Sequence, residues 1–285
     1  MGDQARKQFG FFVTRPTTLA VVALAVLLVG AATVGSPWRR HGPKTSAVTD
    51  TTLVGAATSG AGWTTYGHDY GNNRYLPLDQ ITTGNAASLQ PLWTHSHLSD
   101  WRPGRRQQTA RTAQITTPLM AGGVLYYTAP NSMAFAVDAR TGKELWRYVP
   151  ELPVPRGFHA LPLCCGRTNR GVALLGDKVF LATLDARLVA LRTRDGRVVW
   201  ESRIADPLDG YSETMAPVVA DGKVIIGVSG GEFGVRGFVD AYDAETGRRV
   251  WRSWTVPSPE EGGWWGKWAT TTPDGDRLAP SIPPT

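Results

Sequence analysis

Cysteine is scarce in this sequence, because its 285 residues contain only Cys164 and Cys165. Without a third cysteine, these two neighbours can pair only with each other inside one chain. Adjacent Cα atoms lie about 3.8 Å apart, whereas ordinary disulfides prefer about 4.4–6.8 Å. A disulfide between them would be strained and would close almost no loop, which argues against a stabilising role. Adjacency alone leaves two interpretations: a strained, reducible disulfide or a reduced pair of small apolar residues.

The folded part of the chain also lacks an excess of basic charge. The formal net charge is +6, but six of the 30 Lys and Arg residues and one of the 24 acidic residues lie in the first 44 positions. The remaining charges nearly cancel. A nucleic-acid-binding surface needs basic charge concentrated on the folded domain. We therefore exclude nucleic acid as a partner.

One long uncharged run, residues 17–38, reads TTLAVVALAVLLVGAATVGSPW. Its length suits a bilayer-spanning helix of roughly 20 residues. Arg6, Lys7 and Arg15 precede it, as in the n-region of a signal, and place residues 1–16 in the cytoplasm. The run predicts a transmembrane anchor or a signal segment. No cysteine follows it directly, which excludes a lipoprotein.

This segment sets the expected location of the chain. An anchored chain would stay on the inner membrane with its domain in the periplasm, and a cleaved signal would release that domain to the periplasm. Residues 39–62 are rich in Ser, Thr, Gly and Ala and predict a flexible linker. The folded domain is expected to span residues 63–285.

A repeat of about fifty residues dominates the rest of the sequence. Trp93, Trp146, Trp200 and Trp251 are separated by 53, 54 and 51 residues. Before each of the last three, a strand, a glycine-containing turn and a second strand are expected, and another β-rich run lies upstream. Several strands per unit without an amphipathic helix are typical of β-propeller blades. We expect an all-β propeller with roughly four units, in which the tryptophans pack between blades.

The motifs resemble those of the methanol/ethanol family of quinoprotein alcohol dehydrogenases, which use pyrroloquinoline quinone (PQQ). Residues 63–67 (WTTYG) and 78–81 (LDQI) are similar to the opening blade of that family, and the repeats resemble its tryptophan-docking motif. The most specific feature is the cysteine pair followed five residues later by Arg170. The resemblance covers residues 63–265 and implies a propeller of the quinoprotein dehydrogenase type, with eight blades in the family and roughly four here.

The resemblance also implies a cofactor site. In the family, a vicinal disulfide, here Cys164–Cys165, lies against one quinone face, and an arginine, here Arg170, contacts the cofactor. A second motif runs from TMAP at 214–217 to SGGEFGVRG at 229–237. It implies that the quinone's carboxylates and carbonyls are held by Thr214, Ser229, Gly230 and Gly231. Glu232 would ligate calcium or a lanthanide, since a carboxylate suits a hard cation.

The sequence departs from the family pattern at two points. The family usually places Glu or Gln three residues before the proline of its first cofactor-facing strand, but Ile115 holds that position before Pro118, with Gln114 next to it. The aspartate that acts as catalytic base comes from a later blade. We therefore assign no catalytic base within this chain.

The resemblance predicts an oxidoreductase acting on CH–OH groups of an alcohol or sugar-type substrate in the periplasm. Electrons would pass to cytochrome c or to membrane ubiquinone. The chain would be an incomplete half, so activity of the chain alone is in doubt. The alternative is a non-catalytic propeller scaffold of the envelope, of the outer-membrane-assembly type, which needs neither Cys164–Cys165 nor Glu232.

Overall fold

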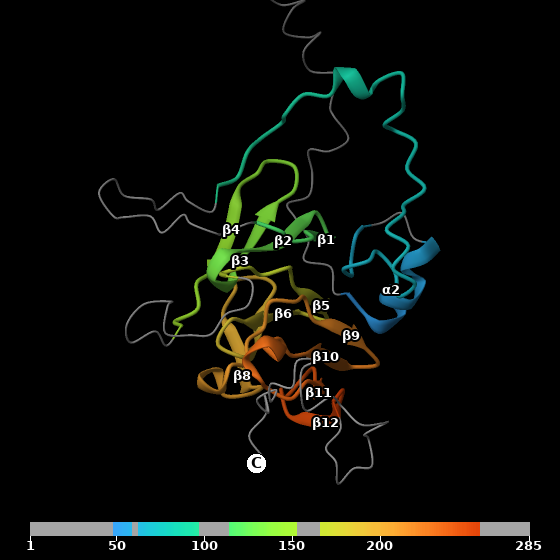
Figure 1. Cartoon of the computed structure of the whole chain (residues 1–285). Coiled ribbons are helices and arrows are strands. Elements are labelled where there is room, and N and C mark those ends of the chain that lie inside the picture. The colour runs from blue at the N-terminus through green and yellow to red at the C-terminus, as the bar shows by residue number, and fades with distance from the viewer. Residues whose placement is uncertain (1–47, 59–61, 97–113, 153–165, 257–285) are drawn as a thin grey trace, which may run out of the picture. The chain divides into compact units, whose positions relative to one another are not determined.

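The computed structural model describes residues 48–58, 62–96, 114–152 and 166–256 (Figure 1). The chain divides into two compact units, 1–42 and 43–285, and all described residues belong to the second. Within the described ranges, no helix is long and apolar enough to cross a membrane. Because residues 17–38 lie outside those ranges, the transmembrane or signal segment stays a prediction.

The described strands form three four-stranded antiparallel sheets, each made of strands that follow one another in the chain. The first sheet comprises β1 (Leu119–Ala121), β2 (Val124–Ala129), β3 (Met133–Asp138) and β4 (Glu144–Tyr148). The second comprises β5 (Ala173–Leu175), β6 (Lys178–Thr183), β7 (Arg187–Arg192) and β8 (Val198–Arg203). The third comprises β9 (Val218–Ala220), β10 (Lys223–Gly227), β11 (Phe238–Asp243) and β12 (Arg249–Trp254). Three consecutive four-stranded meanders are the blades of a propeller, which confirms the predicted all-β class.

The last hairpin of each blade turns at a glycine with positive φ. These residues are Gly142, Gly196 and Gly247, with φ of 70°, 69° and 71°. A Cβ at any of them would lie 2.6 Å from the indole of the preceding repeat's tryptophan. Glycine is therefore required at these positions for two reasons: the backbone is left-handed, and the indole ring approaches too closely to leave room for a side chain.

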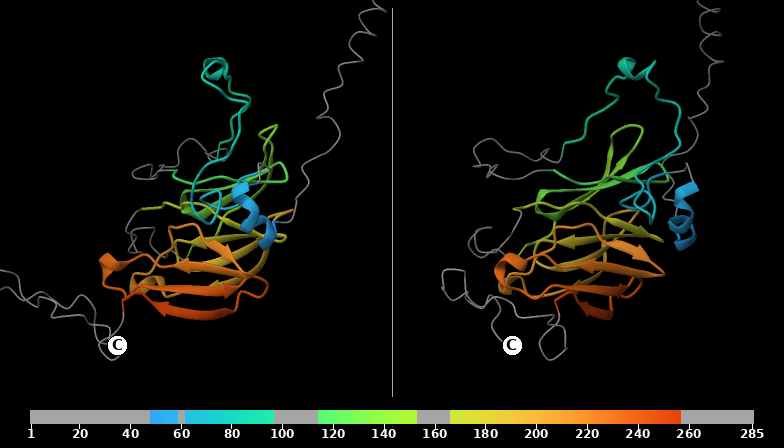
Figure 2. Two further views of the ribbon diagram at one scale, coloured as in Figure 1. Left: turned by 90° about the vertical axis from the view of Figure 1, so that its right-hand side faces the viewer. Right: turned by 45° about the vertical axis from the view of Figure 1, so that its right-hand side comes forward.

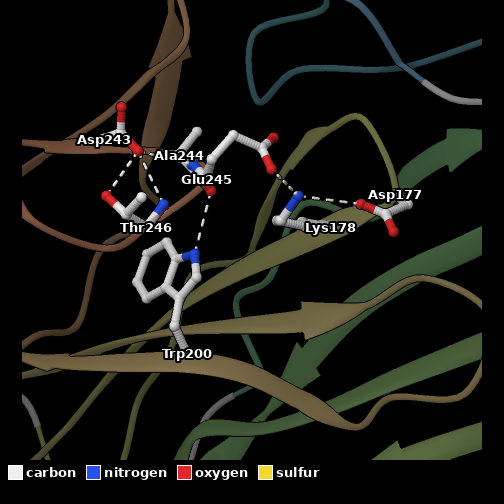
Figure 3. Close-up of polar contacts among 7 residues, drawn as sticks. All are labelled: Asp177, Lys178, Trp200, Asp243, Ala244, Glu245 and Thr246. Carbon is white, nitrogen blue, oxygen red and sulfur yellow. Dashed lines mark hydrogen bonds and ion pairs between the residues drawn. The ribbon is translucent and has the colours of Figure 1, made fainter.

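The repeat tryptophans join each unit to the next blade, as the sequence predicts. Nε1 of Trp146 donates to the Thr193 carbonyl at 2.7 Å, and Nε1 of Trp200 donates to the Ala244 carbonyl at 3.1 Å. Trp93 makes the corresponding bond to the first blade at 3.1 Å. Figure 3 shows the Trp200 indole below the turn that carries Ala244.

A buried lysine strengthens the contact between the second and third blades. Lys178 is 7% exposed, and its Nζ lies 2.7 Å from Glu245 Oε2 and 3.1 Å from Asp177 Oδ1 (Figure 3). Burial lowers the pKa of Lys178, but the hydrogen bonds to Glu245 and Asp177 outweigh it, so the pKa is raised. The ammonium therefore stays charged and paired between the blades.

Burial along the strands shows how the blades are stacked. In the second sheet β6 is buried along its whole length, whereas in the third sheet β10 alternates between buried and half-buried residues. Figure 2 shows the second sheet, in yellow, between the green first and orange third sheets. A sheet covered on both faces buries both side-chain sets. The largest buried side chains include Tyr126, Phe135, Phe180, Leu181, Leu188, Phe238 and Tyr242.

The first tryptophan repeat differs from the prediction of roughly four units. Residues 62–96 contain the short 3-10 helix η2 (Ala86–Ser88) and an isolated bridge from Trp63 to Met120, but no four-stranded sheet. Pro77 and Pro91 lie in this segment, and proline cannot donate to a β-ladder. The described residues therefore hold three complete blades, and the first repeat contributes its docking tryptophan and single contacts such as the Trp63 bridge, but no blade.

Part of the predicted linker at 39–62 is also folded. Residues 48–58 contain α2 (Asp50–Val54) and the 3-10 helix η1 (Gly55–Thr58). The Thr49 hydroxyl caps α2 by accepting from Thr52 N at 3.1 Å. Leu53 is 1% exposed, and Val48 bridges to Gly176 in the second blade. Val48 and Leu53 therefore belong to the hydrophobic core, and the small polar residues around them gave no sign of this in the sequence.

Candidate functional site

Arg170 joins the segments that lead into all three blades. Its Nη1 donates to Thr214 Oγ1 at 2.7 Å and to the Thr214 carbonyl at 3.0 Å. Its backbone N also donates to that carbonyl at 3.1 Å, and its own carbonyl accepts from Thr117 N at 3.2 Å. Thr117, Arg170 and Thr214 precede β1, β5 and β9, the strands at the same edge of the three sheets. The repeat therefore brings residues about fifty positions apart to one place.

Ser229 completes a group of polar side chains at this place. Its backbone exchanges two hydrogen bonds with Ser212, of 3.0 and 3.1 Å, and its hydroxyl lies 3.3 Å from Thr214 Oγ1. We call the side chains of Arg170, Thr214 and Ser229 the Arg170 cradle. One guanidinium and two hydroxyls can bind carboxylate and carbonyl oxygens. The structure thus brings together three residues that the sequence assigns to one site.

The glycines after Ser229 shape the neighbouring backbone. Gly230 has φ of 129°, and a Cβ there would lie 2.2 Å from the Gly210 carbonyl oxygen and 2.9 Å from Val235. At Gly231, which begins the 3-10 helix η6 (Gly231–Phe233), a Cβ would meet nothing within 4 Å. Gly230 is therefore fixed by packing, while Gly231 leaves open space in which a flat ligand can approach the backbone.

Glu232 follows on η6 and is exposed, so its carboxylate is accessible to a cation. Among the described residues, no group of three or more His, Cys, Asp or Glu side chains is placed to hold a metal ion. Glu232 therefore fits the role of one oxygen ligand, and any further protein ligands would have to come from outside the described ranges.

The remaining predicted positions contribute less. Cys164 and Cys165 lie outside the described residues, so their contact with a cofactor and their pairing stay predictions. Ile115 is 45% exposed and brings no polar group. The Gln114 side-chain amide donates to the Thr128 carbonyl of β2 at 3.2 Å. Gln114 therefore acts as a link to its own blade.

Sequence reasoning missed Tyr66, whose phenol lies beside the cradle. A hydrogen bond from Arg74 lowers the pKa of Tyr66, and a bond to Thr117 and the charges of Arg74 and Arg170 lower it further against the effect of burial. The Arg74 guanidinium also lies over the Tyr66 ring, 5.0 Å from its centroid. Only the WTTYG resemblance pointed to this segment, and it carried no functional signal.

Sequence reasoning also missed Glu213, which lies in the chain between Ser212 and the cradle residue Thr214. Glu213 is fully buried, and neither carboxyl oxygen has a hydrogen-bond partner within the described part of the chain. Burial, reinforced by the charge of Asp240, raises the pKa of Glu213 well above its usual value. The sequence SETMAP gives no sign that this acid is buried.

Comparison with known proteins places this fold and site in a family. Residues 63–277 match the family described as the glucose/ethanol/alcohol dehydrogenase β-propeller domain, PQQ. The chain belongs to the PQQ-dependent alcohol dehydrogenase family. The match covers all three described blades and the Arg170 cradle, and it confirms the resemblance that the motifs indicate.

Individual members of the PQQ-dependent family are similar over most of this chain. A quinohemoprotein alcohol dehydrogenase, ADH IIB, of Pseudomonas putida is 46% identical over 193 residues, which are 68% of this chain and 26% of that protein. A 1-butanol dehydrogenase (cytochrome c) of Thauera butanivorans is 42% identical over 196 residues, again 68% of this chain and 26% of that protein. These relatives are named as alcohol-oxidising enzymes.

A solved structure of a europium-containing methanol dehydrogenase has the same fold. It superposes with a TM-score of 0.64 at 33% identity, covering 74% of this chain and 35% of that one. The chain therefore spans about a quarter to a third of the length of the family members it matches.

Proposed function

We propose that this chain forms part of a periplasm-facing dehydrogenase that oxidises an alcohol or sugar-type hydroxyl with bound PQQ. The observation that carries the proposal is the Arg170 cradle, in which the guanidinium and two hydroxyls meet beside the open backbone at Gly231. A propeller that served only as a scaffold would not need this arrangement. The names of the family members support an alcohol as the substrate class.

The cradle residues suit the chemical groups of the cofactor. PQQ carries carboxylates and ring carbonyls, and when bound it supplies the oxidising power that removes two electrons from the substrate's CH–OH group. Arg170 provides a permanent positive charge for an anionic group, and Thr214 and Ser229 provide hydroxyls that orient it. The contacts of Arg170 with Thr214 fix these donors before a ligand arrives, which lowers the cost of ordering them.

For the cation, we propose calcium or a lanthanide on Glu232. The carboxylate of this exposed residue is a hard oxygen ligand. We propose that the further metal ligands and the catalytic base are supplied by parts of the propeller beyond the described blades. The cysteine pair at 164–165 is proposed as a disulfide wall of the same pocket.

We also propose that the chain supplies an incomplete half of the propeller ring. Each of Trp93, Trp146 and Trp200 docks on the blade that follows it. Trp251 is 40% exposed, and no acceptor for its Nε1 is found within the described ranges. A further blade docking on Trp251 would repeat the pattern once more.

We propose the electron acceptor from the expected cellular location of the chain. An anchor or signal at 17–38 would hold the domain on the periplasmic side of the inner membrane or deliver it to the periplasm. Cytochrome c is the proposed acceptor for a released form, and membrane ubiquinone for an anchored one. The name of one family member, which includes cytochrome c, supports the first of these.

The direct test is binding of PQQ to the purified chain, followed by tryptophan fluorescence with and without Ca²⁺ or La³⁺. Arg170→Ala removes the charge and both side-chain contacts to Thr214, and we expect it to weaken binding by roughly 10–100-fold. Arg203→Ala is the matched control, because Arg203 is 61% exposed on β8. Equal affinities of the two variants would contradict the cradle as the binding site. No binding by the wild-type chain or by a longer product of its gene would favour the scaffold alternative.

A further inference from the structure

Glu213 lies in the backbone segment that forms the cradle. On one side of it in the chain, Ser212 pairs with Ser229 through backbone hydrogen bonds, and on the other the Thr214 hydroxyl lies 3.3 Å from the Ser229 hydroxyl. Glu213 itself is fully buried, and its carboxyl oxygens make no hydrogen bond to the cradle residues. A displacement of the Glu213 backbone must therefore move Thr214, and with it the contact to Arg170.

Glu213 lies close enough to Asp240 to feel its charge, and Asp240 is a buried acid that is already paired. Asp240 is 0% exposed and accepts a two-point contact from Arg252, at 2.7 and 2.8 Å, and a hydrogen bond from the Tyr242 hydroxyl at 2.9 Å. Arg249 lies 4.0 Å from the same carboxylate. These groups pair with Asp240, and within the described ranges no Lys, Arg or His side chain pairs with Glu213.

The carboxyl group of Glu213 is buried without a partner. Neither of its oxygens has a hydrogen-bond partner among the described residues. Removing an ionised carboxylate from water without a counter-ion is far more costly than removing a neutral acid. The charge of Asp240 adds to the effect of burial in raising the pKa of Glu213.

We propose that Glu213 is a proton-dependent latch for the Arg170 cradle: the neutral acid keeps Thr214 against Arg170 and Ser229, and loss of its proton loosens the cradle and weakens cofactor binding. An ionised Glu213 must gain water or a cation, which requires the segment 212–214 to move. The negative charge of ionised Glu213 would also lie one residue from Thr214, whose hydroxyl is proposed to bind the anionic cofactor. The binding part of this proposal rests on the proposed function, whereas the titration of Glu213 does not.

The direction of the pH effect follows from proton linkage. The folded chain holds the Glu213 proton more tightly than the unfolded chain does, so stability falls as pH rises above the ordinary carboxyl range. The loss is at most about tenfold in the folded-to-unfolded ratio per pH unit. Glu213→Gln keeps the size and neutrality of the side chain and removes the proton that can be lost.

The experiment compares the wild-type chain with Glu213→Gln, with Glu151→Gln as a matched control because Glu151 is exposed. Without cofactor, we expect an infrared carbonyl band of a protonated carboxyl near neutral pH in wild type and Glu151→Gln only. Thermal unfolding should show that the melting temperature of Glu213→Gln rises relative to that of wild type between about pH 5 and about pH 8. A missing band, or a Glu213→Gln variant that is no more stable at the higher pH, would contradict the proposal that Glu213 is protonated near neutral pH and loses its proton as the pH rises.

PQQ binding is then measured over the same pH range. The ratio of the Glu213→Gln affinity to the wild-type affinity should rise by up to about tenfold per pH unit as Glu213 ionises. Parallel affinity profiles would overturn the latch even if the infrared band confirms a neutral acid. If neither chain binds PQQ, the proposed function and the latch fail, while the infrared and unfolding results still report the charge state of Glu213.

Discussion

At the scale of single residues, the site depends on a few positions where the residue type is tightly constrained. Gly230 has both a positive φ and a neighbouring carbonyl oxygen where a Cβ would be placed. The Arg170 cradle depends on three side chains from different segments, each fixed by a hydrogen bond of 2.7–3.3 Å. Small changes at these positions therefore act on the backbone as well as on the ligand contacts.

We predict that Gly230→Ala lowers the free energy of unfolding by more than about 3 kcal/mol, because it combines a clash with backbone strain. Gly222→Ala is the matched control, since Gly222 has φ of 66° but open space around a Cβ. The control should cost about 1–2 kcal/mol through strain alone. Urea unfolding of the two variants measures the difference, and equal costs would show that Gly210 moves away from the added methyl group.

The sequence predicted that Arg170, Thr214 and Ser229 lie together, and it missed Glu213 and Tyr66 for a physical reason. Arg170, Thr214 and Ser229 belong to motifs in register with the repeat, and the fold brings them together as expected. Glu213 and Tyr66 were missed because their roles arise from neighbours distant in the chain. An acid within a polar segment is normally solvated, and only the folded structure shows that Glu213 is buried.

At the scale of elements, the tryptophan contacts hold successive units together. Each indole combines a hydrogen bond to a turn carbonyl with packing on a glycine that lacks a side chain. Phe180 also lies 5.8 Å from Trp200, centroid to centroid, which anchors the ring to its own blade. The units are therefore joined at their outer hairpins as well as at the cradle.

Trp200→Phe is expected to cost about 0.5–1.5 kcal/mol of stability, because it removes the Nε1 bond to Ala244 and leaves that buried carbonyl without its partner. Trp251→Phe should cost less than about 0.5 kcal/mol, since Trp251 is 40% exposed. Chemical unfolding monitored by circular dichroism compares the two. A larger loss for Trp251→Phe would mean that Trp251 is docked in solution, against the exposure seen here.

The periodicity of the sequence predicted the three blades, but it overestimated the first unit. Trp93 has the correct spacing and docks as its counterparts do, so the tryptophan signal alone does not distinguish a blade from a docking segment. The strands of a blade require a ladder of backbone donors, and the proline-containing segment before Trp93 does not provide one. The short helices α2 and η1 were not predicted, because their buried residues Leu53 and Ala56 lie among small polar residues that are typical of a linker.

At the scale of the whole molecule, all described residues belong to one compact unit, and the apolar run at 17–38 lies outside it. We predict that the full chain sediments with membranes and resists extraction at alkaline pH, because residues 17–38 have the length and composition of an anchor. A chain that begins at Pro43 should be soluble and keep the same melting temperature. Release of the full chain without shortening of its N-terminus would contradict the anchor, and a shortened chain in the periplasm would indicate a cleaved signal.

The tryptophan contacts give the series of blades a direction. Trp93, Trp146 and Trp200 each donate forward, to the last turn of the blade that follows in the chain, so each of the three described blades receives an indole from the preceding repeat. A break between two blades would therefore expose an indole N–H donor on one fragment and a turn carbonyl acceptor on the other. Two copies of the same fragment would not supply this pair at the broken boundary. Fragments cut at such a boundary should recombine with their correct partners in preference to their own copies, which makes this architecture suited to assembly from separately expressed pieces.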